Sequence, residues 1–554
     1  MPLCHTAREL GRFIIPPIRL LPVKPLIVDA LASGRGRRRV TRDVIGAGPR
    51  SLAGVFEGRG VYPCVVRVED ALTGGFQFSD FDLLLVSGMT SDLSSVRHVV
   101  SRWRKTEGGP VIVGGPITSD LGVMRKIKID IAVTGEGELT LLELLDSGLL
   151  GGHLPSKQSL SGIKGISYLK GSEIQVNPLR PVMERRDFEK QNPSTRVIVD
   201  YPLYHSARVY VEVLRGCSNY HRARLASPQG ECGECDLCRS GGLLERYDCP
   251  RGIPPGCGYC SVPSLYGPPK SRSAERILSE IEGLLNRGVR RIVLSAPGFL
   301  DYGRDLLVEP EPLTDPRFPE PNYMAIDGLL SDISALDAVT EGEASFMIEN
   351  LKGELVTWEA AEIIGRHLAG TPVNVGFETG CENHSIQIGR SATPEENLVA
   401  VKRLDRAGLK PYVYFVHGLP GQDKGTVDAT VEAINESMEA GASRVILYRF
   451  QPLPMSAFHD RSKAPPAVRD RLSRRIYEAA HKANASRKEE MIGEQIRVVV
   501  AEPYDRDRRF SVAYPMLHGP VVLVEGVEGM DGEIVEVTVS RVVSNRIIEG
   551  THST

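Results

Sequence analysis

The sequence lacks a long apolar segment and lacks an excess of either charge. No uninterrupted apolar run approaches the about 18 residues that a membrane-spanning helix needs. Near the start, Pro16, Pro17, Arg19 and Pro22 interrupt the short apolar stretch at 13–15, so we expect no signal peptide. The formal net charge is only -3, which argues against a uniformly basic nucleic-acid coat and against an acidic disordered chain. We expect a cytoplasmic protein without membrane contact.

Cysteine is also scarce, but its distribution is uneven. Of the 10 cysteines, only Cys4, Cys64 and Cys381 lie outside the segment 217–260. A secreted disulfide scaffold is short and spreads its cysteines along the chain. A tight group in a chain without a signal peptide instead indicates metal or iron–sulfur ligation in a reducing compartment.

The length of 554 residues suggests about three or four domains. Changes of pattern divide the chain into an extension, a β/α domain, a connector with a hairpin over 165–176, a second β/α series, a basic helical segment and a small β-barrel. Their boundaries are 1–23, 24–150, 151–205, 206–460, 461–490 and 491–554.

The first β/α domain shows continuous apolar strands alternating with helices. The predicted strands are 26–28, 82–86, 111–113 and 129–133. This pattern predicts a parallel, doubly wound sheet, and the glycines that follow its strands lie where such sheets let ligands approach.

The second series contains at least six β/α units in order from position 209. We therefore expect a partial or complete parallel barrel, whose chemistry lies at the carboxyl ends of its strands. The cysteines directly follow its first strand. Their pairwise CxxC spacing is typical of soft-metal sites. The seven thiols divide into a set of three and a set of four. Three thiolates can hold a four-iron cluster with one iron left open, and four thiolates fill all the ligand positions of a site. One or two structural zinc sites are the alternative.

The sequence around these cysteines resembles the radical S-adenosylmethionine (radical SAM) superfamily. The resemblance is carried by Glu212-x2-Arg215-Gly216-Cys217 and by Gly256-Cys257-Gly258-Tyr259-Cys260. It implies a [4Fe-4S] cluster, bound SAM and an external electron donor. The electron cleaves SAM to a 5′-deoxyadenosyl radical, which abstracts hydrogen from the substrate.

The cluster ligands depart from the usual C-x3-C-x2-C. We favour Cys249, Cys257 and Cys260, because they lie on one compact loop, with Cys217 as the alternative first ligand. Four thiols then remain for a second site, which holds zinc or another iron–sulfur cluster. With the favoured choice they are Cys217, Cys232, Cys235 and Cys238, on an insertion that spans 217–249.

Further segments match SAM contacts of the superfamily. Glu378 and Gly380 lie in a strand-end turn that matches a polar contact, and Gly418 and Gly421 match a glycine motif near the adenine. The common Gly-Gly-Glu is missing after the second strand, so no contact is assigned there.

The N-terminal domain resembles the cobalamin-binding domain that precedes many radical SAM modules. It lacks the Asp-x-His-x2-Gly motif that supplies a cobalt-ligating histidine, and a scaffold without a corrin is the alternative. The residues expected at the cobalamin are Ser87, Gly88, Thr90, Gly114, Gly115, Gly135 and Gly137.

The C-terminal segment resembles the TRAM domain, a small RNA-binding barrel. The matching strands start at Ile492 and Gly532. Small barrels of this class bind oligonucleotides on one face, and the basic segment 461–490 offers phosphate contacts. The resemblance implies RNA, and tRNA in particular, as the partner.

Taken together, the sequence predicts a cobalamin-dependent radical SAM methyltransferase that modifies RNA. Two alternatives stay open. One is a tRNA methylthiotransferase with an auxiliary cluster, and the other is a zinc-stabilised RNA-binding protein without chemistry. A protein substrate in place of RNA also stays open.

Overall fold

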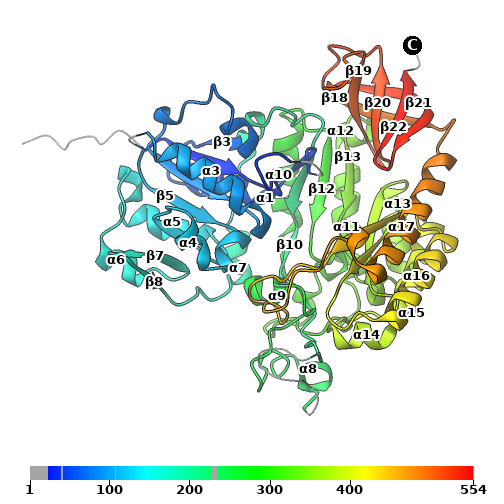
Figure 1. The fold of residues 1–554 in the computed structure, drawn as a ribbon, viewed down its shortest axis with the longest axis horizontal. Helices are drawn as coiled ribbons and strands as arrows, with labels where there is room; N and C mark the ends of the chain where they lie inside the picture. Colours follow the sequence, from blue (N-terminus) through cyan, green and yellow to red (C-terminus); the bar gives the residue numbers. More distant parts are fainter. Residues whose placement is uncertain (1–22, 39–40, 107, 226–231, 233–234, 553–554) are drawn as a thin grey trace, which may run out of the picture.

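The computed structural model describes residues 23–38, 41–106, 108–225, 232 and 235–552. It confirms the predicted α/β class, with an N-terminal parallel sheet, a second β/α series and a closed C-terminal barrel (Figure 1). Among the described helices, none is both long and apolar enough to cross a membrane.

The first sheet contains five parallel strands in the order β3-β1-β4-β5-β6. The hairpin predicted over 165–176 forms as β7 and β8 and extends the sheet in antiparallel fashion. Chain order reverses between β1 and β4, and ligands bind outside the carboxyl ends of strands near such a point. The strands are β1 (Pro25–Asp29), β3 (Cys64–Arg67), β4 (Leu83–Ser87), β5 (Val111–Gly114), β6 (Ile131–Val133), β7 (Ile166–Lys170) and β8 (Glu173–Val176).

The second series forms two neighbouring four-stranded parallel sheets, β13-β12-β9-β2 and β14-β15-β16-β17. The chain passes from the first of these sheets to the second at Glu349, which lies between β13 and β14. Together they make a partial barrel. Its strands are β2 (Val44–Ile45), β9 (Arg208–Glu212), β12 (Arg291–Ser295), β13 (Ser345–Ile348), β14 (Asn350–Leu351), β15 (Pro372–Glu378), β16 (Lys410–His417) and β17 (Arg444–Arg449).

Helices connect these strands. They are α10 (Ala274–Leu285), α11 (Tyr323–Ser334), α13 (Trp358–Leu368), α14 (Glu382–Gln387), α15 (Pro394–Arg406) and α16 (Lys424–Glu439). The start of α15 shows why they form where they do. Thr393 and Glu396 make a reciprocal capping box, and Pro394 occupies the first turn, where it costs no hydrogen bond.

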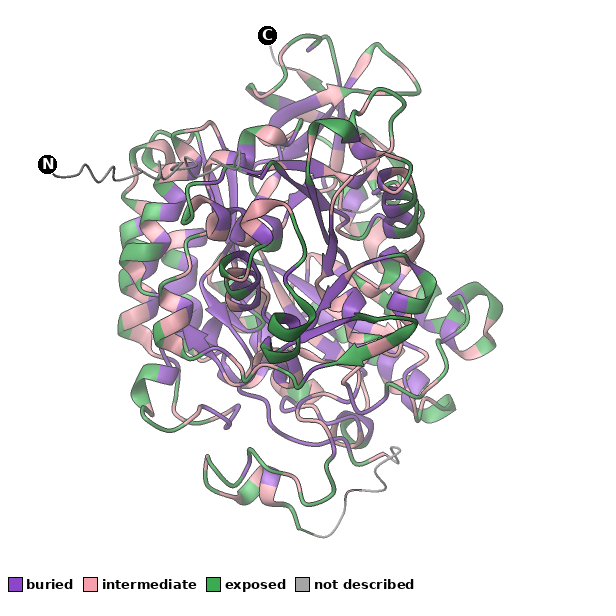
Figure 2. Cartoon of the chain, turned by 90° about the vertical axis from the view of Figure 1, so that its left-hand side faces the viewer, coloured by how far each residue is buried: buried purple, intermediate pink, exposed green. Residues whose placement is uncertain are grey.

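The two β/α domains share one apolar core. Ile27 and Phe56 of the first domain belong to the same buried cluster as Val209 and Ile292 of the second. Figure 2 shows the strands of both sheets mostly buried and the outer helices partly exposed. Strand β2 lies before helix α1 (Ala47–Glu57) in the chain, yet it pairs with β9 of the partial barrel. The placement of the two domains is therefore fixed by packing rather than by a flexible linker.

The buried Arg50 of α1 adds a polar tie between the domains. Its guanidinium donates to the carbonyl of Tyr210, at 2.6 Å, and to the carboxylate of Glu280, at 2.7 Å. Helix α1 thus fixes the first sheet to the inner strand β9.

The C-terminal barrel closes in the order β18-β19-β20-β22-β21. It contacts the amino ends of the partial-barrel strands: Ser345, which begins β13, donates to the carbonyl of Met516 at 2.6 Å. The cysteines follow the carboxyl ends of the same strands. The C-terminal barrel and the cysteines therefore lie at opposite ends of the second domain (Figure 1). The barrel strands are β18 (Gln495–Pro503), β19 (Phe510–Pro515), β20 (Val521–Glu525), β21 (Ile534–Ser544) and β22 (Ile547–His552).

The basic segment predicted to be helical over 461–490 is α-helical only in its second part, as α17 (Arg471–Glu490), after a short 3-10 helix, η9 (Ala467–Arg469). Several of its cations have partners within the protein. Arg487 donates to the carbonyls of Met438 and Ala442 at the end of α16, and the buried Lys488 donates to Ser544. These charges stabilise the fold and are not free for phosphates.

Candidate functional site

Three thiols meet at the carboxyl end of the first strand of the partial barrel. Cys217 follows β10 (Leu214–Arg215), and Cys257 and Cys260 lie in the loop before α9 (Val262–Tyr266). Burial, together with the nearby thiols of Cys257 and Cys217, raises the pKa of Cys260 to about 12. Gly216 makes the turn into Cys217 with φ of 92°, and a Cβ there would lie 2.1 Å from the carbonyl oxygen of Pro268. Only glycine fits at that position.

Each of these three sulfurs accepts an N–H group. The backbone N–H of Asn219 lies 3.5 Å from the sulfur of Cys217, and its side-chain amide lies 3.4 Å from that of Cys257. The backbone N–H of Val262 lies 3.5 Å from the sulfur of Cys260. Such donors stabilise thiolates and tune iron–sulfur clusters.

This donor set fits a four-iron cluster. Among the described residues, no three Cys, His, Asp or Glu side chains are arranged to hold a single metal ion. In a cluster each thiolate binds a different iron, so the sulfurs need not converge on one point.

The structure favours Cys217 over Cys249 as the third member of this set, which differs from our first choice. Cys249 instead lies with Cys232, Cys235 and Cys238, whose thiols interact electrostatically with one another. Nearness along the chain favours Cys249, whereas the insertion after Cys217 folds back on itself and brings Cys217 near Cys257. The backbone N–H of Gly256 donates to the carbonyl of His221 at 2.9 Å, and this contact returns the chain to Cys257 beside Cys217.

Glu378, predicted to contact SAM, points toward the three thiols. It ends β15 with φ of 65°, at a bulge in the pairing with β16. Strained, bulged positions of this kind re-aim side chains at functional sites. Burial raises the pKa of Glu378, although Arg390 and the Tyr259 hydroxyl oppose the shift.

Arg390 joins Glu378 to the cysteine loop. Its guanidinium lies 3.8 Å from the Glu378 carboxylate, 3.4 Å from the Tyr259 hydroxyl and 3.7 Å from the sulfur of Cys257. Nothing in the sequence identified Arg390, because it belongs to no motif and its partners come from two distant loops.

A second, partly buried cation, Lys352, lies near Cys217. Its ammonium donates to Asp301, at 2.5 Å, and to the hydroxyl of Ser218, and its charge acts on the thiol of Cys217. Asp301 is fully buried and also pairs with Arg304. This charged cluster occupies the end of the second strand, where the sequence supplied no assignment.

The predicted glycines have different surroundings. A Cβ on Gly380 would lie 2.3 Å from the carbonyl oxygen of Ala429, so this glycine lets helix α16 pack closely. Gly418 and Gly421 line a hollow together with Leu225 and Phe450.

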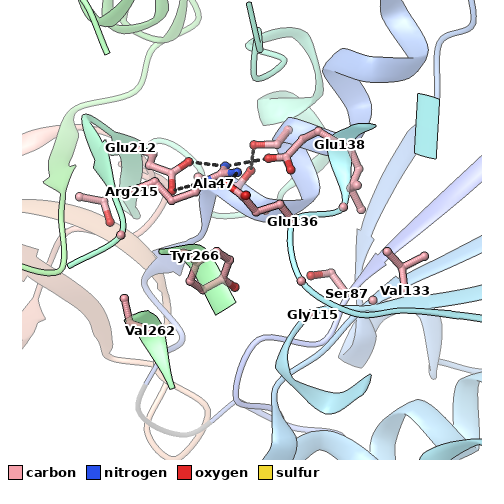
Figure 3. A pocket seen from close by; sticks show the side chains of 18 of the residues that line it. Ala47, Ser87, Gly115, Val133, Glu136, Glu138, Glu212, Arg215, Val262 and Tyr266 are labelled. Carbon is pink, nitrogen blue, oxygen red and sulfur yellow. Dashed lines mark hydrogen bonds and ion pairs between the residues drawn. The ribbon is translucent and has the colours of Figure 1, made fainter. Parts of the chain in front are cut away.

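A cavity of about 410 Å³ lies between the two β/α domains. Figure 3 shows Ser87, Gly115 and Val133 of the first sheet on one side, and Val262 and Tyr266 on the other. Since Val262 is two residues from Cys260, the cavity reaches from the strand ends of the first domain to the cysteine loop. Its volume lies within the usual range for small-molecule sites.

Five of the seven residues expected at the cobalamin line this cavity, namely Ser87, Gly114, Gly115, Gly135 and Gly137. The other two do not. A Cβ on Gly88 would meet Val96 and Ile117 in the domain core, and the hydroxyl of Thr90 donates to the carbonyl of Pro116.

One wall of the cavity is a buried ionic network around Arg215 (Figure 3). Arg215 pairs with Glu212 and Glu138, both at 2.7 Å, and with Glu136 at 3.1 Å. Lys270 pairs with Glu136 at 3.0 Å. The Glu212-x2-Arg215 spacing in the sequence allows these two side chains to pair. Through Glu136 and Glu138, Arg215 also connects the first domain to the cysteine strand.

Comparison with known proteins agrees with this architecture. The family model of the Radical SAM superfamily matches residues 247–434. An uncharacterised protein of Methanocaldococcus jannaschii is 40% identical over 505 residues, which cover 91% of this chain and 93% of that protein. An uncharacterised methyltransferase of Pyrococcus horikoshii is 24% identical and covers 66% of this chain and 69% of its own length.

Among solved structures, the radical SAM methyltransferase TsrM from Kitasatospora setae, with cobalamin and a [4Fe-4S] cluster bound, resembles the chain with a TM-score of 0.55. The match covers 79% of this chain and 74% of TsrM at 15% identity. The resemblance is therefore one of fold.

Proposed function

Since this chain belongs to the radical SAM superfamily, we propose that it is a methyltransferase that uses cobalamin together with SAM. The observation that carries the proposal is the cavity between the glycine-rich strand ends of the first sheet and the cysteine loop. When bound, the cluster with SAM supplies a 5′-deoxyadenosyl radical and the corrinoid supplies the methyl group. The protein binds, orients and shields these groups.

The residues around the three thiols have different roles in binding the cluster and SAM. Cys217, Cys257 and Cys260 hold the cluster. Glu378 accepts a hydrogen bond from SAM, and Arg390 holds the Glu378 carboxylate toward the cluster. Burial of both side chains excludes water, which strengthens their electrostatic effect on the bound cofactor.

The cavity fits a corrinoid in its chemistry. A Cβ on Gly135 would meet no atom within 4 Å, so the strand end there is open for a flat ring. The carboxylates of Glu136, Glu138 and Glu212 offer acceptors to the amide side chains at a corrin edge. A corrinoid is larger than this space, so we expect only part of the corrinoid to lie inside the cavity. No histidine is present among the described lining residues, so the protein offers no imidazole to cobalt there.

Gly114→Leu is expected to prevent corrinoid binding while leaving the cluster intact. A Cβ at Gly114 meets only ordinary contacts, the nearest being the carbonyl oxygen of Val133 at 3.8 Å, so a larger side chain extends into the cavity without straining the backbone. We expect bound corrinoid to fall at least about tenfold, equivalent to about 1.4 kcal/mol. The measurement is corrinoid and iron per chain after anaerobic reconstitution.

Gly328→Leu is the matched control, because Gly328 lies on the exposed side of α11 with open space around it. It should bind as much corrinoid as the wild-type protein. A wild-type protein that binds iron but no corrinoid would overturn the proposal and favour a methylthiotransferase.

RNA as the substrate stays a prediction. The C-terminal barrel supports it by its closed five-stranded form, but it packs at the amino ends of the strands, away from the cysteines. An RNA held by the barrel must therefore extend along the molecule to reach the cavity. We expect one modified nucleoside to be absent from the RNA of a deletion strain, as measured by mass spectrometry. An unchanged nucleoside profile would contradict RNA as substrate and favour a protein.

A further inference from the structure

The insertion between Cys217 and Cys257 carries its own group of four thiols. They are Cys232, Cys235, Cys238 and Cys249, and Cys249 precedes Pro250. Cys238 is buried, and Cys232 and Cys249 pack against a small apolar cluster that contains Ile253. The Cys232 thiol interacts electrostatically with the thiols of Cys238, Cys249 and Cys235, so the four thiols lie near one another.

A buried cation without a carboxylate partner lies beside this group. Arg222 is 2% exposed, and among the described residues no carboxylate forms an ion pair with it. Its guanidinium donates to the backbone carbonyls of Ile253 and Tyr247, at 2.8 and 3.0 Å, and to the sulfur of Cys249. An isolated buried charge is costly, so this arrangement calls for an anion at the sulfurs.

A second guanidinium faces the same thiols. The charge of Arg239 interacts with Cys238 and Cys232, and its contact with Asp236 is long, at 3.7 Å. Two cations beside four thiols match a metal centre whose thiolates give it net negative charge. They do not match four neutral thiols.

We infer that Cys232, Cys235, Cys238 and Cys249 hold a second four-iron cluster, for which Arg222 is the buried counter-charge. The spacing C-x2-C-x2-C with a remote Cys-Pro is that of ferredoxin-type clusters. A single zinc ion bound by the same four sulfurs is the alternative, and the metal content of the variants below separates the two.

Because four thiolates leave no open iron, the second cluster does not bind SAM. Its role is to hold the insertion together. Arg222 contacts both the Cys249 sulfur and the Ile253 carbonyl, so it connects the second cluster to the segment that returns the chain to Cys257. The inference does not depend on the proposed methyl transfer.

Two triple variants of the full chain separate the sites. In the first, alanine replaces the thiols at the proposed SAM site; in the second, it replaces three thiols of the insertion. We expect about eight iron atoms in the wild-type protein and about four in each variant, because each cluster contributes four. The changes are Cys217→Ala, Cys257→Ala and Cys260→Ala in the first variant, and Cys232→Ala, Cys235→Ala and Cys238→Ala in the second.

Electron paramagnetic resonance of the reduced proteins identifies which cluster remains. The first variant should keep a signal that SAM leaves unchanged, and the second a signal that SAM alters. The first variant leaves the insertion intact, so its result stands even if the second fails to fold. About one zinc ion and no iron in the first variant would overturn the inference, as would only about four iron atoms in the wild-type protein.

Arg222→Met tests the counter-charge. It should lose the second cluster, whereas Arg59→Met should keep it. Arg59 pairs with Asp146 at an exposed position of the first domain, away from the insertion, so it is the control. Equal iron content in both variants would contradict the role assigned to Arg222. Corrinoid content is not measured in these experiments, so their outcome is separate from that of the proposed function.

Discussion

Replacing Cys217 with alanine is expected to abolish SAM cleavage. We expect the rate to fall by at least about a thousandfold, equivalent to about 4 kcal/mol in the barrier. The reason is that Cys217, Cys257 and Cys260 form one set, in which each sulfur accepts an N–H donor. The measurement is 5′-deoxyadenosine formed under reducing conditions, together with iron per chain, which should fall to that of the second cluster alone.

The matched variant is Cys249→Ala. Its thiol belongs to the insertion, so SAM cleavage should stay within about tenfold of wild type, a change of at most about 1.4 kcal/mol in the barrier. The contacts that place Cys257 beside Cys217 do not involve the Cys249 side chain. Loss of SAM cleavage in Cys249→Ala with retention in Cys217→Ala would reverse the assignment and restore the compact-loop alternative.

This pair of cysteines shows where sequence reasoning reached its limit. Strand ends followed by glycine predicted the cavity, because parallel strands bring their carboxyl ends to one edge. Spacing did not predict which cysteine completes the set, because that depends on how an insertion folds back. The matched family segment begins at residue 247 and therefore does not include Cys217.

Two cations of the site gave no signal in the sequence. Arg390 and Lys352 follow no motif, and each acts through partners that tertiary folding brings near. The sequence predicted that the C-terminal barrel forms but not where it packs. A strand pattern carries no information about which face of another domain the folded barrel contacts. Gly380 has a second reason to be glycine that the sequence did not reveal, since helix packing leaves no room for a Cβ there.

Arg215→Met is expected to lower the free energy of unfolding by about 3–5 kcal/mol, the usual cost of removing one partner from a buried ionic network. The side chain of Arg215 is only 9% exposed and is shared by three carboxylates. Without it, Lys270 is the remaining cation of the network, and it contacts Glu136. The measurement is the shift of the first urea transition. Arg290→Met is the control, because its pair with Glu343 is exposed and should contribute at most about 1 kcal/mol.

The pH dependence distinguishes a lost charge from a lost packing contact. In the wild-type protein, burial opposes the charged form of Glu138, but Arg215 and Lys270 outweigh burial and lower its pKa below the ordinary value of about 4.5. Glu138 therefore adds stability above that value, and this is lost only as the pH falls through the lower, folded pKa. In Arg215→Met, burial dominates and the pKa of Glu138 rises.

The variant then loses stability at every pH above its raised pKa, because the unfolded state ionises Glu138 more readily. Protonation relieves this cost as the pH falls through the raised pKa, so the difference from wild type should narrow over that range. A difference that stays constant with pH would mean that the side chain acts by packing alone, for example through its contact with the ring of Phe188. Narrowing would show that the charge balance of this network stabilises the protein. The network forms a wall of the cavity and joins the first sheet to the cysteine strand, so the same charge balance holds the two halves of the site together.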